Sequence, residues 1–435
     1  MKKRKALSLL YCLVLVFATG FGMVLLTSHA HSKEVTLRFF NTETESSTVD
    51  YLNKISKEWE QKTGVKIVLE NAPVDTTYQK LMTSIKAGKP YDIANCQFIA
   101  DVVALQSEGH LIPVTSIVDK IGRKDYGPNI LFPLKGEIWW VPYDYNFITM
   151  YIRKDLFERK RIAPPKTWDE WLKAAKALTE DNRYGVAMPL SVGQVTGFCT
   201  APILWANGVQ IFDDNWKVVF DSPTMKPRVI ESLNLLKELH KYMPPGMVSA
   251  SWGDTISTFV TEKAAMVPYA GRMIHNLEKN APQLADKYQM IGFPTPDGKR
   301  YAVSWAGDGW SVLNGPNQKE ALAFVEWLAT EKYIGFLHTL PLHYIPCRFS
   351  IYDNPKWKDD PILKKHWTAV EMTLTLMKTG IIHSIDTDGP YMDLRPAKVY
   401  HAMVIPEMFQ DVIIKGIDPG KAVDTAGEKI RKLLK

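Results

Sequence analysis

The pattern of apolar and polar positions changes sharply within residues 136–147. Ile138, Trp140 and Phe147 suit a pleated, half-buried surface and predict a strand. Pro142 cannot lie inside a central ladder, so the strand is expected to end or to leave its sheet there.

Beyond that proline, polar Asp144 and Asn146 alternate with aromatic residues, and a helix is predicted at 154–157. A chain that leaves one sheet, exposes a carboxylate and an amide among aromatic rings, and then begins another structured region indicates a crossing between two lobes. Ligand sites are common at such junctions. A hairpin with a polar turn is the alternative interpretation.

The N-terminal part of the chain alternates between strand and helix patterns. The predicted elements, strand first, are 34–40, 48–64, 65–69, 78–87, 91–94 and 101–109. This order predicts an α/β fold with a parallel or mixed sheet and covering helices. Ligands bind outside the C-terminal strand ends of such sheets, which is where Asn41, Glu43 and Gln97 fall.

The rest of the chain continues the α/β pattern. Predicted helices cover 167–178, 200–207, 229–239 and 318–330, with a last one through 430, and predicted strands cover 184–189, 218–220, 263–272 and 288–293. Thr167 is the expected N-cap of its helix, with Glu170 as capping-box partner. Tyr269 and Arg272 are expected at a strand end.

Residues 302–312 read as two strands that flank a glycine-containing centre. That centre offers Asp308 between two tryptophans. Trp305 and Trp310 are either core residues or platforms on which a ligand ring could stack.

Residues 1–32 predict a secretory signal, with basic residues at 2–5, an apolar run at 6–26 and small residues just before residue 32. The run is also about long enough to span a bilayer, so an uncleaved anchor is the alternative. We expect no lipid anchor at Cys12, because bulky Tyr11 precedes it and the apolar run continues past it.

The 435 residues, 46% of them hydrophobic, are enough for two large cores. The formal net charge is +6, but four positive charges lie at residues 2–5, which leaves 6 − 4 = +2 for the rest. This balance does not indicate a nucleic-acid-binding protein. Cys96, Cys199 and Cys347 lie far apart among apolar neighbours and predict buried thiols, although one disulfide is possible.

No metal or cofactor is expected. His338 and His343 lack the spacing and flanking carboxylates of a metal site, so structural roles are predicted for both. The chain contains no phosphate-binding loop, dinucleotide fingerprint, HExxH or GxSxG motif.

Seven segments, taken in order, carry a resemblance to a known family. They are WEQKTGVKI (59–67), GKPYDI (88–93), GEIWWVPY (136–143), PPKTWDEW (164–171), FDSP (220–223), FVTEKAAM (259–266) and GDG (307–309). The chain resembles extracellular solute-binding protein family 1, the sugar-binding subunits of ATP-driven importers such as the maltose-binding protein and its multiple-sugar relatives.

The resemblance implies two α/β lobes around a hinge, each a mixed sheet flanked by helices, in the type II-like arrangement of periplasmic binding proteins. The implied lobes are 33–145 with 303–345, and 146–302 with 346–435. It also implies an exported, periplasmic or otherwise extracytoplasmic monomer without catalytic activity. Such a protein binds a mono- or oligosaccharide in its cleft and presents both lobes to the membrane permease subunits.

The candidate residues make chemical sense for a sugar, which has an apolar C–H face and a polar rim. Aromatic rings supply flat apolar area, and planar carboxylate, amide and guanidinium groups supply paired hydrogen bonds. The expected ligand-binding residues are Asn41, Glu43, Gln97, Asp144, Asn146, Tyr269, Arg272, Trp305 and Asp308. Arg272 stands where relatives often carry an aromatic residue, which casts doubt on a neutral maltodextrin and admits an acidic ligand.

Two other functions are compatible with the sequence. A secreted glycoside hydrolase would need two carboxylates, for which Asp144 and Asp308 are the candidates. A sugar-binding module that feeds a membrane sensor would differ from a transport subunit only in its partner.

Overall fold

Ten strands of the described residues organise the fold, and hydrogen-bonded neighbours follow the order β2-β1-β3-β8-β5-β6, with β4 and β10 beside β8 and with β7 and β9 beside β5. The computed structural model describes residues 35–127 and 130–435, so the predicted signal lies outside it. The strands are β1 (Thr36–Asn41), β2 (Lys66–Asn71), β3 (Ile93–Cys96), β4 (Leu111–Ile112), β5 (Val141–Arg153), β6 (Met266–Tyr269), β7 (Tyr288–Ile291), β8 (Ala302–Leu313), β9 (Ile345–Pro346) and β10 (Ile381–His383).

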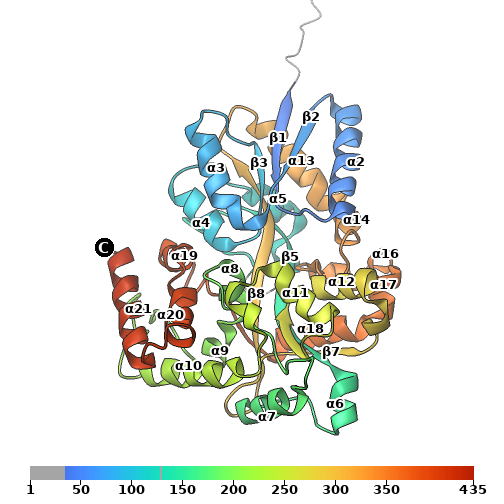
Figure 1. The fold of residues 1–435 in the computed structure, drawn as a ribbon. Coiled ribbons are helices and arrows are strands. Elements are labelled where there is room, and N and C mark those ends of the chain that lie inside the picture. The colour runs from blue at the N-terminus through green and yellow to red at the C-terminus, as the bar shows by residue number, and fades with distance from the viewer. Residues whose placement is uncertain (1–34, 128–129) are drawn as a thin grey trace, which may run out of the picture. The chain divides into compact units, whose positions relative to one another are not determined.

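The predicted strand–helix alternation of the N-terminal part is confirmed. Its helices are α2 (Ser46–Thr63), α3 (Thr77–Lys86), α4 (Ile99–Ser107) and α5 (Thr115–Ile121), and two later helices, α13 (Gln318–Thr330) and α14 (Tyr333–Leu337), lie in the same part of Figure 1. Strand β1 is parallel to β2 and β3, whereas β8 is antiparallel to β3. The sheet is therefore mixed, as the sequence predicts.

The remaining helices surround the other strands. They are α6 (Lys154–Lys160), α7 (Trp168–Leu178), α8 (Gln194–Cys199), α9 (Pro202–Ala206), α10 (Lys226–His240), α11 (Trp252–Val260), α12 (Arg272–Asn280), α15 (Phe349–Tyr352), α16 (Pro355–Lys358), α17 (Pro361–Lys365), α18 (Trp367–Thr379), α19 (Leu394–His401), α20 (Val404–Ile413) and α21 (Pro419–Leu433). Short 3-10 helices occur at η1 (Val74–Thr76), η2 (Arg123–Asp125), η3 (Pro245–Ser249) and η4 (Pro282–Leu284).

Strands β5 and β8 are long and connect a first group of strands, β1 to β4, with a second group, β6 and β7 (Figure 1). Antiparallel pairing joins β5 to β8 from Val141 to Ile148, after which β5 pairs with β6 and β7. The C-terminal half of β8 pairs with β3. The polar residues at 144 and 146 therefore lie in the strand that passes from one group to the other, and the alternative of a hairpin with a polar turn is wrong.

The strand predicted to end at Pro142 in fact begins just before it, at Val141. The register against β8 shifts between Pro142 and Asp144, which marks a β-bulge. A bulge tolerates a proline because the local ladder is already interrupted there. This local irregularity explains why the prediction failed.

Residues 302–313 form one continuous strand, β8, and not two strands around a turn. Gly307 and Gly309 lie within it because its backbone runs against Trp140: a Cβ atom at either position would lie within 2.8 Å of a tryptophan ring atom. The two glycines therefore serve close packing. Trp310 is a core residue, since it is fully buried and its ring lies 4.7 Å from that of Tyr143.

Two other strand predictions were wrong in detail. The segments 184–189 and 218–220 contribute only isolated bridges, from Tyr184 to Ala264 and from Phe212 to Val218. The helix predicted over 200–207 is confirmed as α9, which begins at Pro202. Proline is favoured in the first turn of a helix, which explains this start.

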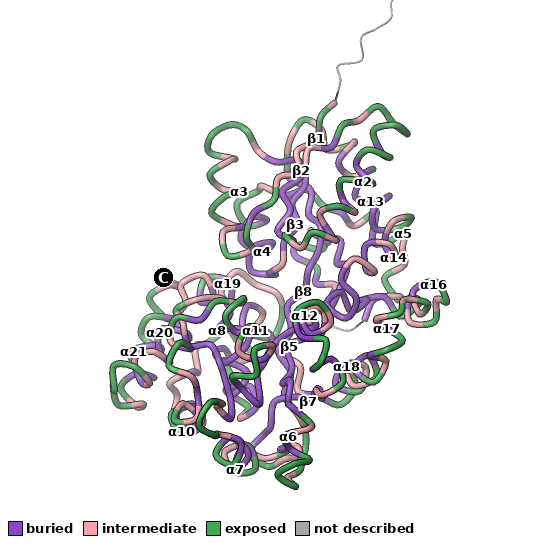
Figure 2. The backbone as a smooth tube through the Cα atoms, turned by 45° about the vertical axis from the view of Figure 1, so that its right-hand side comes forward, coloured by how far each residue is buried: buried purple, intermediate pink, exposed green. Residues whose placement is uncertain are grey.

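Local signals fix the ends of several helices as predicted. The backbone N–H of Gly64 donates to the Glu60 carbonyl at 2.8 Å and the residue has φ 77°, so it ends α2 in the left-handed conformation. The capping box of Thr167 and Glu170 begins α7. Buried residues concentrate in the strands and on the helix faces turned toward them (Figure 2). Within the described part of the chain, no helix is long and apolar enough to cross a membrane.

The thiols behave as the sequence predicts. Cys96, Cys199 and Cys347 are all buried and free. Burial raises the pKa of each thiol, so none is an activated nucleophile.

Helix α12 begins at a point of very close backbone approach. A Cβ atom on Gly271 would lie 1.6 Å from the Leu342 carbonyl oxygen, although the glycine itself has an ordinary φ of −58°. The contact holds the start of α12 against residues 342–343. It also corrects the prediction for Arg272, which is the first residue of α12 and not the end of a strand.

Gly271→Ala should therefore destabilise the protein by about 1–3 kcal/mol, because the new methyl group forces two backbone segments apart. Urea unfolding followed by far-UV circular dichroism measures the change. Gly246→Ala is the matched control, since a Cβ there meets nothing within 4 Å. Equal stability of the two variants would show that the close approach is not a constraint.

Candidate functional site

A cavity of about 290 Å³ lies beside the β5–β8 pair. Its volume is at the lower end of the range for small-molecule sites, about 300–1,000 Å³. It is lined by Thr42, Glu43, Thr44, Pro73, Val74, Asp75, Gln97, Phe98, Asn146, Ile148, Ser251, Trp252, Gly253, Tyr269, Ala270, Arg272, Ala306, Asp308 and His343. These residues come from the segments after β1, β2 and β3, from β5 and β8, from the start of α11, from the β6–α12 region and from the loop before β9.

Six of the nine predicted ligand-binding residues line this cavity. They are Glu43, Gln97, Asn146, Tyr269, Arg272 and Asp308. Asn41, Asp144 and Trp305 do not line it. The structure thus brings together side chains that are up to 265 positions apart in the sequence, from residue 43 to residue 308.

Glu43 is the most heavily bonded group of the site. Its carboxylate receives hydrogen bonds from Gln97 Nε2 and from Arg272 Nη2, and the second contact is an ion pair. His343 Nε2 lies 3.5 Å from Oε1, the oxygen that also accepts from Gln97, and Glu43 itself is only 1% exposed. A buried carboxylate of this kind needs both its charge partner and its hydrogen bonds.

These neighbours decide the protonation of Glu43. Burial alone would raise its pKa, but the positive charge of Arg272 and the hydrogen bond from His343 outweigh burial and lower the pKa from 4.5 to about 2. Burial and the same guanidinium lower the pKa of His343, so its imidazole is neutral at pH 7. Arg272 Nη2 also lies 3.1 Å from His343 Nε2, so the guanidinium contacts both Glu43 and the imidazole.

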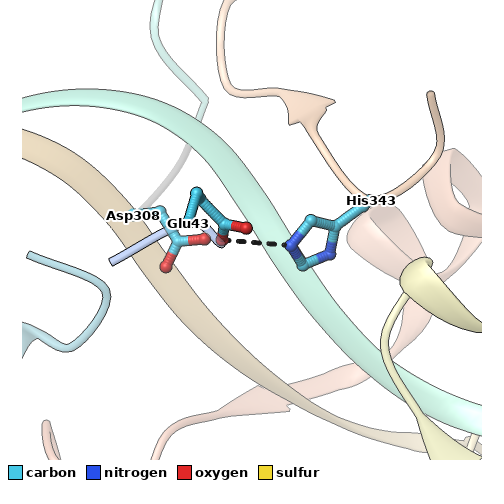
Figure 3. A group of neighbouring side chains, drawn as sticks. All are labelled: Glu43, Asp308 and His343. Carbon is cyan, nitrogen blue, oxygen red and sulfur yellow. Dashed lines mark hydrogen bonds and ion pairs between the residues drawn. The ribbon is translucent and has the colours of Figure 1, made fainter. Parts of the chain in front are cut away.

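Glu43, Asp308 and His343 have the spacing of a metal site: one ligand atom from each lies within 4.8 Å of the others (Figure 3). The histidine was predicted to be structural, and nothing in its sequence neighbourhood indicates this position. Arg272 already supplies the cation that Glu43 and the imidazole contact. These residues could hold a metal ion only if the guanidinium moved away. His338 instead contacts the Trp357 carbonyl at 3.0 Å, a structural role.

Asp144 and Asp308 lie directly opposite each other in the β5–β8 ladder. Opposed residues of an antiparallel pair have Cβ atoms about 4.5–5.5 Å apart. Both side chains are fully buried. Burial, together with the charge of Asp308, raises the pKa of Asp144 well above its usual range. Burial and the charge of Glu43 do the same to the pKa of Asp308, against the opposing effect of Arg272.

Asn41 has a supporting position behind the cavity. Its Nδ2 donates to the Glu43 carbonyl at 2.6 Å and to Asn71 Oδ1 at 2.8 Å, and its Oδ1 accepts from the Glu43 N–H at 3.4 Å. The amide therefore orients the loop that carries Glu43. Trp305 lines a different cavity, of about 390 Å³, together with His383 and Tyr391.

Among the side chains of the cavity that the sequence analysis missed are Asp75, Phe98, Trp252 and His343. Trp252 is the first residue of α11 and donates to Asp75 Oδ1 across the cavity at 3.4 Å. Its helix begins at a capping box of Ser251 and Asp254, a signal that the sequence contains but that carries aspartate where glutamate is usual. Phe98 and Asp75 follow strands of the first group, as Gln97 does.

Helix α12 presents a row of basic side chains to the loop after β1. Arg272 pairs with Glu43. One turn further His275 lies 3.5 Å from Glu45, and after another turn Lys279 lies 2.8 Å from the same carboxylate. The spacing of three and then four residues places all three on one helix face. The row leads from the buried carboxylate of the cavity to the surface.

Comparison with known proteins shows what the chain is similar to. The family described as bacterial extracellular solute-binding protein matches residues 45–334. A maltooligosaccharide ABC transporter solute-binding lipoprotein of Streptococcus pneumoniae is 26% identical over 66% of this chain and 65% of its own length. A mannitol-binding protein of Pseudomonas aeruginosa is 24% identical over 65% of this chain and 66% of its own length.

The fold is that of two-lobe proteins of the maltose-binding type. A solved ABC transporter solute-binding protein of Thermotoga lettingae, bound with alpha-D-tagatose, superposes with a TM-score of 0.78 at 22% identity. The match covers 92% of this chain and all of the other. The fold class implied by the resemblance is confirmed. The residue boundaries of the two lobes stay a prediction.

The low pKa of Glu43 predicts a pH-dependent contribution to stability. Because the folded-state pKa lies below the unfolded value, the stabilisation is complete above about pH 4.5 and is lost as the pH falls toward 2. The difference in unfolding free energy between wild type and Glu43→Gln should shrink by about 2 kcal/mol from pH 5.5 to pH 3. Urea titrations at several pH values measure it.

The raised pKa values of Asp144 and Asp308 act in the opposite direction, and Glu43→Gln weakens this effect because the charge of Glu43 contributes to both pKa shifts. Glu371→Gln removes an exposed glutamate of α18 and is the control for losing a surface carboxylate. Parallel pH profiles for wild type and Glu43→Gln would contradict the ion-pair assignment.

Proposed function

Because the chain belongs to the bacterial extracellular solute-binding protein family, we propose that it is the carbohydrate-binding subunit of an ABC importer. It captures a mono- or oligosaccharide in the cavity beside β5 and β8 and delivers it to the membrane permease subunits. The named relatives that bind maltooligosaccharide and mannitol support a carbohydrate or polyol ligand.

One observation carries the proposal: flat aromatic rings and planar polar groups face the same small cavity. Phe98, Tyr269 and Trp252 supply rings, and the planar polar groups are those of Gln97, Asn146, Arg272 and Asp308. A pyranose needs this combination, because its C–H face is apolar and its rim carries hydroxyl groups.

The cavity is lined from both groups of strands, which suits a ligand that favours closure. Glu43 and Gln97 follow strands of the first group, and Trp252 and Arg272 belong to the second. A ligand can shift an open–closed equilibrium only through contacts that differ between the two states, such as contacts to both sides at once. Residues 143–147 are the proposed hinge crossing.

The description of the family as extracellular supports a function outside the cytoplasm. We propose that residues 1–32 direct export and are removed near His31 or Lys33, and that the mature protein is a monomer without a lipid anchor. The basic residues 2–5 and the apolar run after them support the export signal.

The arrangement does not favour a glycoside hydrolase. Such an enzyme needs two carboxyl groups that reach opposite sides of one glycosidic bond. Asp308 lines the cavity, whereas Asp144 does not and is fully buried behind it. Glu43 is held by an arginine and by Gln97, with a pKa too low for a general acid.

A thermal-shift screen of carbohydrates tests the function. At 100 times its Kd a ligand should add about 2.7 kcal/mol to the unfolding free energy, a clear rise in Tm. Trp252→Ala should weaken binding of that carbohydrate about thirtyfold, or ~2 kcal/mol, because a stacking ring is lost. Phe349→Ala removes an exposed ring outside the cavity and is the control. A screen in which no carbohydrate raises Tm would refute the proposal.

Incubation with the tightest carbohydrate should return it unchanged. Chromatography after prolonged incubation at pH 5 and pH 7 measures the outcome. Cleavage products that appear with wild type and disappear with Asp308→Asn would instead establish a hydrolase.

A further inference from the structure

The wall of the cavity contains more carboxyl groups than cationic side chains. Arg272 is the sole lysine or arginine among the described residues that line it, and its guanidinium is already paired with Glu43. Asp308 and Asp75 line the same cavity, and Asp144 lies directly opposite Asp308 in the ladder. The carboxyl groups that lack a cationic partner are therefore Asp308 and Asp144, which lie together.

The acceptor atoms at this wall of the cavity have few hydrogen-bond donors within reach. Both carboxyl oxygens of Asp308, both of Asp144 and the Oδ1 of Asn146 are buried and make no hydrogen bond of good geometry with the described residues. The side chains of Asp144 and Asn146 lie close enough to Asp308 to lower its pKa in part, but they leave room for a further donor. Asp308 and Asn146 face the cavity. Buried polar atoms in folded proteins are normally paired, so a ligand that fits this wall must bring donors.

Of the polar groups that carbohydrates carry, the protonated amine fits best. An ammonium has three donors, no acceptor and a positive charge, whereas a hydroxyl brings one donor, two acceptor lone pairs and no charge. A carboxylate or phosphate brings only acceptors and further negative charge, so the pairing of Arg272 with Glu43 argues against an acidic ligand. Hydrogen bonds from a cation to a carboxylate are about twice as strong as neutral ones.

We propose that the carbohydrate bound in this cavity carries a protonated amino group, which donates to Asp308 and Asn146 with Asp144 behind them. The ligand class is an amino sugar or amino polyol. This inference rests on the proposed function, because it specifies the ligand of the same site.

The local charges predict how binding depends on pH. The groups that face Asp308 are Glu43 from the loop after β1, Asp144 and Asn146 from β5, Arg272 from α12 and His343 from the loop before β9. Burial raises the pKa of both aspartates, so the empty site keeps its protons to a higher pH than exposed aspartates do. An ammonium that enters expels a proton, and affinity for the amine should rise between pH 5 and pH 7.

Isothermal titration calorimetry with matched sugar trios tests the inference. The probes are glucosamine, N-acetylglucosamine and glucose, together with the corresponding galactose and mannose trios. In at least one trio the free amine should bind tenfold or more tighter than both neutral sugars. Titrations at pH 6.5 in buffers of different ionisation enthalpy should show a proton released on binding.

Two variants separate charge recognition from general damage. Asp308→Asn should lower affinity for the amine at least tenfold and remove the preference over the neutral sugars. Asp386→Asn is the matched control, since Asp386 is a fully buried aspartate outside the cavity that is bonded to Ser384 and to the Ala100 N–H. It should keep the preference. If Asp308→Asn does not fold, the wild-type trios and the proton release decide the question alone.

The outcomes distinguish this inference from the function on which it rests. Tight binding of neutral sugars, with amines equal or weaker and no proton released, would overturn the inference and leave carbohydrate binding intact. Absence of binding by every carbohydrate to folded protein would overturn both. An amine preference that survives Asp308→Asn would also overturn the inference, because another group would then bind the charge.

Discussion

The antiparallel pairing of β5 and β8 is the constraint on which the rest of the structure depends. Each strand also pairs with strands of one group, β8 with β3 and β5 with β6, so the pair holds both groups in one hydrogen-bonded series. Its register sets Asp144 opposite Asp308, and Gly307 and Gly309 allow the ladder to lie against Trp140. A slip by one residue would turn both carboxyl groups to the other face.

Much of the fold could be predicted from the sequence, because local patterns determine it. The periodicity of α2 and α13 and the caps at Gly64 and Thr167 are local signals, and the structure follows them. The failures are positions where tertiary packing overrides a local rule. Pro142 lies in a strand because a bulge accommodates it, and Gly307 lies in a strand because a tryptophan packs against it. Neither partner can be inferred from sequence spacing.

The candidate site could be predicted in part, for a related reason. Strand ends and polar residues within an aromatic pattern pointed to six side chains that the structure gathers around one cavity. His343 and Trp252 escaped prediction because their positions depend on how distant loops pack. The reverse also happened: Asn41 carries the right chemistry, but its amide is used to hold the loop of Glu43. A sequence identifies polar groups near a strand end and does not reveal which of them are already bonded.

The ion pairs that the basic residues of α12 form with the loop after β1 respond to salt to different degrees, because some are buried and others are exposed. Lys279 and Glu45 form an ion pair near the surface, where the lysine is 55% exposed, and dissolved ions screen such a pair within a Debye length of about 8–10 Å. Arg272 and Glu43 meet where the carboxylate is 1% exposed, and screening hardly reaches them. A rise in salt concentration therefore weakens the outer pair, Lys279 with Glu45, before the inner one. The inner pair, which borders the cavity, keeps its strength as the salt concentration rises.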